Sequence, residues 1–156
     1  RVRDDKGQPL RSGEIGNIEV KGPNVFKGYW LKTGDVGKVG SDGYVTIVGR
    51  NKDLIISGGY NVYPAEIESA LNEMPGVAES AIVGVPHPDF GEVGVAVVIA
   101  RPGATLDADR LMAELKASLA NFKIPKRCFI ATELPRNTMG KVQKNLLREQ
   151  HKSEFA

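Results

Sequence analysis

A change of pattern near Gly49 divides the sequence into two parts that must fold differently. The first part is rich in glycine and has the pattern of short strands separated by turns. Apolar and polar residues alternate over residues 15–21, which predicts a strand. Ser41-Asp42-Gly43 has hairpin chemistry, because a glycine after aspartate accepts a positive φ, and a β-branched strand is expected at 44–48. Residues 1–50 are therefore expected to be β-rich.

Helix signals begin in the second part. Pro64 suits the first turn of a helix, where its missing N–H would have no partner. Ile67, Leu71 and Met74 follow at spacings of four and three, which places them on one helical face. Pro75-Gly76 then ends the helical pattern.

Strand and helix patterns alternate through the remainder of the chain. The expected strands cover residues 79–85, 94–100 and 127–131, and the further helices cover 107–119 and 143–150. A loop over 86–89 is expected between the first two strands, and a polar loop over 134–142 before the last helix. The fold class predicted for residues 51–156 is α+β: a small domain with a three-stranded sheet flanked by helices.

The composition argues against several classes of protein. Lys and Arg number 21 and Asp and Glu 19, and this net charge of +2 does not indicate nucleic-acid binding. No apolar stretch approaches the roughly 20 residues of a membrane helix. The chain opens on charged residues without a signal peptide or an initiating methionine, so we expect a fragment of a longer cytoplasmic protein.

The sulfur and imidazole side chains do not indicate a metal site. Cys128 is the single cysteine, so it cannot form an internal disulfide and fits a reducing compartment. Its apolar neighbours favour a buried filler over a nucleophile. His87 and His151 are far apart in the sequence, with no cluster of cysteine or acid beside either, so no zinc site is expected. His87 lies in a polar loop and is a weaker candidate for a ligand contact.

Charged residues around the change of pattern are candidates for a nucleotide site. Asp35 ends the string Lys32-Thr33-Gly34-Asp35, where a glycine turn can aim two carboxylate oxygens at the two hydroxyls of a ribose. A turn aspartate that bonds its own backbone is the alternative. Arg50 can bind an anion or a hydroxyl, and Lys52 lies where a hinge would. Surface charges on a linker are the alternative for both.

Two glycine-containing segments are candidates for further chemistry. Gly58 and Gly59, between Ser57 and Tyr60, allow a ligand to approach the backbone closely. Lys141 follows a glycine on a polar loop and is interpreted as a mobile point charge. Such a charge can stabilise oxygens that become negative in a transition state. A solvated surface lysine is the alternative.

These motifs, in this order, resemble the adenylate-forming superfamily of acyl-CoA synthetases, luciferases and peptide-synthetase adenylation domains. The resemblance is specific over residues 49–68 and 135–141. Within the superfamily, residues 20–30, 87–92 and 134–145 are most similar to malonyl-CoA synthetases.

The resemblance implies an acid–thiol ligase that uses ATP, Mg²⁺ and coenzyme A. A small carboxylic acid, malonate or one like it, attacks the α-phosphate of ATP, and the thiol of coenzyme A then displaces AMP. Asp35 and Arg50 would bind the ribose, and Lys52 would be the hinge about which the small domain swings. Lys141 would bridge carboxylate and phosphate during adenylation. The residues expected to line the pantetheine tunnel are Ser57, Gly58, Gly59 and Tyr60.

Electrostatics and space explain why the two steps need different residues. Adenylation joins two anions, so a cation at their junction is worth roughly 3–4 kcal/mol. Thioester formation needs space for a thiol instead, which glycines provide. Moving Lys141 away and bringing the glycine pair in would serve both steps with one small domain.

The chain departs from the superfamily pattern in two places. It lacks the Ser/Thr/Gly-rich phosphate loop and the acyl pocket, so residues 1–50 would be a remnant of a large N-terminal domain that also binds Mg²⁺. That domain is the expected partner, and the chain alone is predicted to be inactive. The resemblance also implies about 15–20 residues between Gly-Tyr-Trp and Thr-Gly-Asp, which Trp30-Leu31-Lys32-Thr33 joins almost directly here. Either this loop is deleted or its residues are missing from the given sequence. A Cα distance between Trp30 and Leu31 far beyond about 3.8 Å would indicate missing residues, and a normal link a true deletion.

Two rival functions remain open at this point. One is an adenylation domain whose acceptor is a carrier protein. The other is a non-catalytic module for protein interaction, recognised by a lysine acetyltransferase. The loop around Lys141 resembles an acylation site, and acetylation there would remove the charge.

Overall fold

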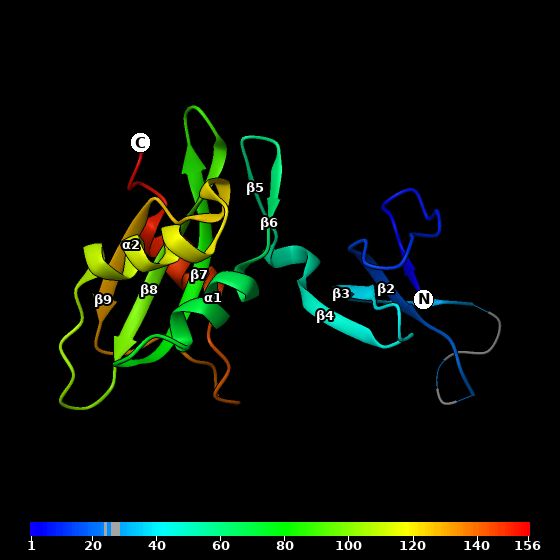
Figure 1. Cartoon of the computed structure of the whole chain (residues 1–156), viewed down its shortest axis with the longest axis horizontal. Coiled ribbons are helices and arrows are strands. Elements are labelled where there is room, and N and C mark those ends of the chain that lie inside the picture. The colour runs from blue at the N-terminus through cyan, green and yellow to red at the C-terminus, as the bar shows by residue number, and fades with distance from the viewer. Residues whose placement is uncertain (24, 26–28) are drawn as a thin grey trace. The chain divides into compact units, whose positions relative to one another are not determined.

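The computed structural model describes residues 1–23, 25 and 29–156. It divides into two compact units, Arg1–Asp53 and Leu54–Ala156, shown in Figure 1. Part of the segment 20–30 that resembles malonyl-CoA synthetases lies outside the described residues. The assignment of residues 1–50 to a larger domain stays a prediction.

The described residues of the first unit form an antiparallel sheet of four strands in chain order. These are β1 (Val2–Arg3), β2 (Gly16–Val20), β3 (Leu31–Val39) and β4 (Val45–Arg50), followed by the 3₁₀ helix η1 (Asn51–Asp53). The predicted strands at 15–21 and 44–48 are confirmed as β2 and β4. The predicted hairpin turn is also confirmed, because Gly43 has φ +84° and the N–H of Tyr44 donates to Asp42 Oδ1 at 3.1 Å.

The predicted glycine turn before Asp35 takes the form of a bulge within β3. Gly34 has φ +80°, and the strand registers with β2 and β4 give neither Thr33 nor Gly34 a partner. The N–H of Asp35 donates instead to Thr33 Oγ1 at 3.1 Å. Such a bulge bends the strand locally and changes the direction of the next side chain.

The second unit is α+β, as predicted, but the sheet has five strands among the described residues, not three. The order is β6-β5-β8-β7, and β9 pairs with β8 in parallel. The strands are β5 (Ile55–Ser57), β6 (Tyr60–Val62), β7 (Val77–His87), β8 (Gly91–Ala100) and β9 (Arg127–Ala131). The helices are α1 (Pro64–Asn72), α2 (Ala108–Ser118), α3 (Lys144–His151) and the 3₁₀ helix η2 (Asn121–Lys123).

The two additional strands arise from the glycine pair. Gly58 and Gly59 connect β5 and β6 as a hairpin, in which Ser57 pairs with Tyr60. The loop predicted over 86–89 is also shorter than expected, because Pro86 and His87 extend β7. The remaining connection is a tight turn into Gly91, whose φ is +74°.

Both faces of the central β7–β8 hairpin are buried. Ile82 and Val98 pack with α1 and α2 on one face, and Val83 and Val95 pack with α3 on the other. Alternate residues therefore enter opposite cores, which explains why these strands are apolar without a polar face. The predicted helix faces are confirmed, since Ile67, Leu71, Leu111 and Leu115 all lie in the first core.

The helix ends have local causes. Pro64 begins α1 as predicted. Asp107 caps α2, because its Oδ1 accepts hydrogen bonds from the N–H groups of Asp109 and Arg110 at 2.9 and 3.1 Å. None of the helices in the described part of the chain is long and apolar enough to cross a membrane.

Leu115→Ala is expected to lower the free energy of unfolding by about 2–5 kcal/mol, because the fully buried side chain would leave a cavity in the first core. Leu146→Ala on α3, where the side chain is 42% exposed, is the matched control and should cost less than about 0.5 kcal/mol. Urea denaturation followed by circular dichroism measures both. Equal losses would contradict the assignment of this core.

Candidate functional site

The two residues predicted to bind a ribose lie directly opposite each other. Asp35 on β3 and Arg50 at the end of β4 are paired in the strand register. Arg50 Nε lies 3.3 Å from Asp35 Oδ1, and the two side chains are 60% and 27% exposed. The guanidinium holds the carboxylate in one orientation while leaving it accessible, so its oxygens can accept hydrogen bonds from vicinal hydroxyls.

Lys52 occupies η1, the last element of the first unit. The division between the units falls immediately afterwards, between Asp53 and Leu54. A change of φ and ψ at this point would displace the second unit as a whole, as a hinge requires. The role of Lys52 as the hinge residue stays a prediction.

The glycine pair forms a tight two-residue turn. Gly58 and Gly59 have φ values of +57° and +83°, the combination that a type I′ hairpin requires. The N–H of Gly58 donates to the carbonyl oxygen of Phe90 at 2.9 Å. This bond joins the β5–β6 turn to the β7–β8 turn, so the two turns lie side by side.

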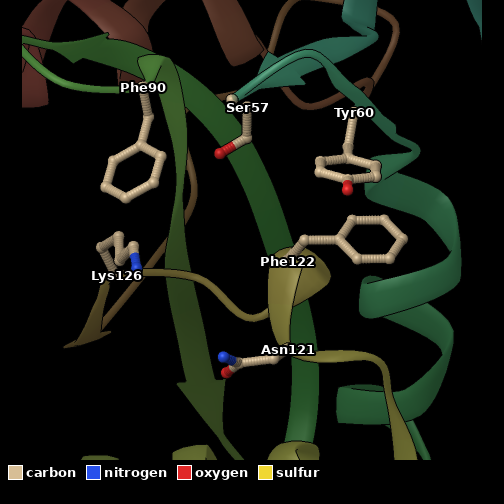
Figure 2. Close-up of a pocket in the computed structure, with 7 residues that line it drawn as sticks. Ser57, Tyr60, Phe90, Asn121, Phe122 and Lys126 are labelled. Carbon is tan, nitrogen blue, oxygen red and sulfur yellow. The ribbon is translucent and has the colours of Figure 1, made fainter.

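A pocket of about 390 Å³ opens beside the glycine turn, as Figure 2 shows. The Phe122 ring stacks on the Tyr60 ring with centroids 4.7 Å apart. The ammonium of Lys126 lies 4.8 Å from the centre of the Phe90 ring. The residues that line the pocket are Ser57, Gly58, Tyr60, Phe90, Asn121, Phe122 and Lys126.

Four of these lining residues were not predicted from the sequence. Phe90, Asn121, Phe122 and Lys126 come from the β7–β8 turn and from the segment around η2. The available signal was an aromatic residue within each of two polar, turn-rich segments. Tertiary structure is needed to bring those segments to the glycine pair.

The charge of the pocket comes from Lys126. Its neighbour in sequence, Lys123, is neutralised by Glu66 of α1, with Nζ 2.7 Å from Oε1. Lys126 is exposed, and its ammonium forms no ion pair with any described residue. An aromatic pocket with one accessible cation suits a ligand that combines rings or alkyl groups with phosphate.

The loop that carries Lys141 turns at Gly140, whose φ is +76°, and is closed by hydrogen bonds. The interpretation of Lys141 as a mobile point charge stays a prediction. The N–H of Gln143 donates to Pro135 O at 2.7 Å, which closes the loop. Within it, the N–H of Asn137 donates to Lys141 O at 3.0 Å, and the N–H of Lys141 donates to Asn137 Oδ1 at 2.9 Å. The Asn137 side chain thus holds the backbone of this loop through hydrogen bonds.

The side chain of Lys141 extends from this loop into solvent. The residue is exposed, and its ammonium forms no ion pair with the described residues. An unpaired ammonium on a fixed backbone is available to meet an anionic ligand without first breaking a salt bridge.

Lys141 and the glycine turn are attached to opposite ends of the β7–β8 hairpin. Arg136 in the Lys141 loop pairs with Glu79 near the start of β7, whereas Gly58 bonds to Phe90 just beyond the end of β7. Eight residue steps from Glu79 to His87 span roughly 27 Å at about 3.4 Å each. Figure 1 shows the same separation, with the β5–β6 turn at the upper end of this unit and the orange loop before α3 at the lower end.

The histidines pack against aromatic rings. His87 lies 5.0 Å from Phe90 and 5.1 Å from Phe155 between ring centroids, and the His151 ring stacks on Phe129 at 4.5 Å. Among the described residues there is no group of three or more His, Cys, Asp and Glu side chains that could hold a metal ion.

The second unit matches a known domain family. Residues 66–141 match the AMP-binding enzyme C-terminal domain. The matched residues lie in the unit that contains the five-stranded sheet and the Lys141 loop. The chain belongs to the adenylate-forming superfamily, of which it represents a C-terminal portion.

Several characterised proteins are similar to this chain. A CoA ligase from Rhodococcus jostii, named for a substituted indenylpropanoyl group, is 50% identical over 94% of this chain and 31% of its own length. Feruloyl-CoA synthase from Amycolatopsis sp is 44% identical over 95% of this chain and 33% of its own length. The crystal structure of ATP-bound MatB from Rhodopseudomonas palustris matches 100% of this chain and 34% of its own, at 52% identity and a TM-score of 0.92.

The chain spans about a third of the length of these relatives. The additional superfamily residues expected between Trp30 and Leu31 stay a prediction.

Cys128 is expected to react slowly with iodoacetamide at pH 8 in the folded protein. Burial raises the pKa of its thiol from 9.0 to about 11, and the charge of Asp109 adds to the increase. At pH 8 only about 0.1% of the thiol would then be ionised. Mass spectrometry of alkylated protein measures the rate, with urea-unfolded protein as the control.

The same raised pKa gives a pH dependence of stability. Because the folded pKa is the higher one, the stabilisation by the neutral thiol is complete below the unfolded value of 9.0 and is lost as pH rises towards 11. Equal alkylation rates in folded and unfolded protein at pH 8 would contradict the burial of this thiol.

Proposed function

We propose that this chain is the C-terminal part of an ATP-dependent, AMP-forming acyl-CoA ligase. The observation that carries the proposal is the placement of two different chemical sites at opposite ends of one sheet. Lys141 supplies a cation at one end, and the glycine turn opens a pocket at the other. A single active centre could meet only one of them at a time, which suits two successive half-reactions.

Adenylation is the half-reaction assigned to the Lys141 end. A carboxylate must approach the α-phosphate of ATP, and the two anions repel each other. The ammonium of Lys141 would lie between them and stabilise the charge that develops on the forming bond. Its lack of an ion pair supports this role, because no carboxylate of the described residues competes for the ammonium.

Thioester formation is the half-reaction assigned to the pocket. Coenzyme A combines an adenine ring and a thin pantetheine arm with phosphates, which matches aromatic walls beside the Lys126 cation. The backbone at Gly59 has open space where a side chain would be, so the arm could pass close to the turn. Ser57, Gly58, Gly59 and Tyr60 would form the near wall of this passage.

The first unit would complete the nucleotide site. Asp35, held by Arg50, would accept the hydroxyls of the ribose, and Lys52 would be the hinge for the swing of the second unit. The phosphate loop, the Mg²⁺ site and the acid pocket belong in our proposal to a large N-terminal domain. This chain is expected to be inactive without that domain.

The acid that we propose is malonate or another small carboxylic acid. The support is the similarity of residues 87–92 and 134–145 to malonyl-CoA synthetases. Relatives named for chemically unlike acids share this region at 44–50% identity, as expected if it serves the steps that such ligases have in common. We further propose a cytoplasmic enzyme in which acetylation of the exposed Lys141 by a protein lysine acetyltransferase would remove the charge and stop adenylation.

Lys141→Ala in the longer protein that includes the large domain is expected to slow adenylation by about 10²–10³-fold, because the two anions would meet without a cation. Pyrophosphate release with ATP and malonate measures this half-reaction. Lys116→Ala is the matched control, since Lys116 is an exposed lysine on α2 without an ion pair to the described residues.

The outcomes separate the candidate functions. Undiminished pyrophosphate release by Lys141→Ala would refute the catalytic role. Failure of the unaltered protein to release pyrophosphate with any carboxylate would favour the non-catalytic module. Acyl transfer to a carrier protein but not to coenzyme A would favour the adenylation domain.

Gly59→Ala is expected to raise the KM for coenzyme A and to leave adenylation unchanged, because a methyl group would enter the proposed passage. Gly103→Ala is the matched control. Both glycines have positive φ, +83° and +78°, and neither Cβ would meet an atom within 4 Å, so the backbone strain is alike. Steady-state kinetics against coenzyme A checks this, and equal KM values in the two variants would refute the assignment.

A further inference from the structure

We propose that Arg136, anchored by Glu79, is a positioning residue that fixes the direction in which Lys141 leaves its loop. The inference rests on the proposed role of Lys141 in adenylation. It adds a specific device, a peptide group held from both sides, that determines where the ammonium can reach.

The peptide group between Gly140 and Lys141 is the centre of this device. Its carbonyl oxygen accepts a hydrogen bond from Arg136 Nη1 at 2.6 Å, and its N–H donates to Asn137 Oδ1 at 2.9 Å. Because a peptide group is planar, two bonds at its opposite edges fix the whole plane. The Cα of Lys141 belongs to that plane. The next peptide group is held too, because the carbonyl oxygen of Lys141 accepts from the N–H of Asn137 at 3.0 Å, so the direction of the Cα–Cβ bond is fixed from both sides.

Arg136 connects this peptide group to the sheet. Its Nη2 pairs with Glu79 Oε2 on β7 while its Nη1 holds the carbonyl oxygen of Gly140. A planar guanidinium can bind two acceptors in fixed directions, whereas an ammonium is a compact point charge. The loop is therefore attached to a strand of the central hairpin through one rigid side chain.

Glu79 is a firm anchor because of its place in β7. It pairs with Ile99 of β8, directly after the register shift between Val77 and Glu79. Such an irregularity changes the direction of the following side chain. The strand on which Glu79 lies is packed between the two cores, so the backbone from which its side chain extends cannot move without the sheet.

The ion pair between Arg136 and Glu79 contributes to the position of the loop and not to the stability of the fold. Arg136 and Glu79 are 44% and 36% exposed, and ion pairs at such exposed positions contribute little to the stability of a fold. Losing the pair should leave the fold intact. Misplacing a catalytic group by about 1 Å, in contrast, can cost roughly 10²-fold in rate.

The experiment compares Arg136→Ala, Arg136→Lys and Glu79→Gln in the longer protein, with Arg110→Ala as the matched control. Arg110 forms an exposed ion pair with Glu114 on α2, away from the loop. Adenylation is measured by pyrophosphate release, and thioester formation by supplying the acyl-adenylate with coenzyme A. Hydrogen exchange of the Lys141 amide reports on the peptide group directly.

We expect Arg136→Ala to lower kcat for adenylation roughly 10- to 100-fold at unchanged KM for ATP and acid. Thioester formation should be unchanged, and the Lys141 amide should exchange faster. Arg136→Lys and Glu79→Gln should fall between Arg136→Ala and the unaltered protein. Arg110→Ala should match the unaltered protein in every measurement.

Two results would overturn the inference. One is normal adenylation by Arg136→Ala, and the other is an equal loss in both half-reactions, which would mark a general structural role. Lys141→Ala, measured in the same assays, separates a failure of the proposed function from a failure of the positioning role of Arg136. If Lys141→Ala adenylates normally, the proposed function fails; if it does not and Arg136→Ala does, only the positioning role fails.

Discussion

The β7–β8 hairpin is the element on which the other features of the second unit depend. It is buried on both faces, so neither strand can bend or twist without disturbing a core. Its two ends carry different attachments: the ion pair of Glu79 with Arg136 at one, and the bond from Gly58 to Phe90 O at the other. A stiff hairpin of this kind keeps the Lys141 loop and the glycine turn at a fixed distance, so the two move together.

The second unit contains both paired and unpaired cations. Lys126 and Lys141 have exposed ammonium groups that form no ion pair within the described residues, and they belong to the opposite ends of the hairpin. Other cations near them are neutralised by carboxylates that tie the elements of the unit together. These pairs are Lys123 with Glu66, Lys144 with Glu68 and Arg136 with Glu79. An anionic ligand could therefore meet an unpaired cation at either end of the hairpin.

The sequence predicted the features that depend on local patterns and missed those that depend on distant contacts. The spacing of Ile67 and Leu71 identified α1, because a helix places such residues on one face. The pocket was missed, since Phe90 and Phe122 reach the glycine turn only through tertiary packing. The hydrogen bonds within the Lys141 loop were also missed, because the contacts of the Asn137 side chain have no periodicity that a sequence could display.

A rigid Lys141 loop is what a swinging domain needs. If the domain delivers the lysine to the reaction by rotation, the loop must already hold its final conformation on arrival. A flexible loop would have to be ordered in every cycle, at about 1–2 kcal/mol for each residue fixed. Asn137 and Arg136 remove that cost by ordering the backbone beforehand, in the folded unit. Mobility then resides in the connection between the units and in the lysine side chain, and the segment between them can stay stiff.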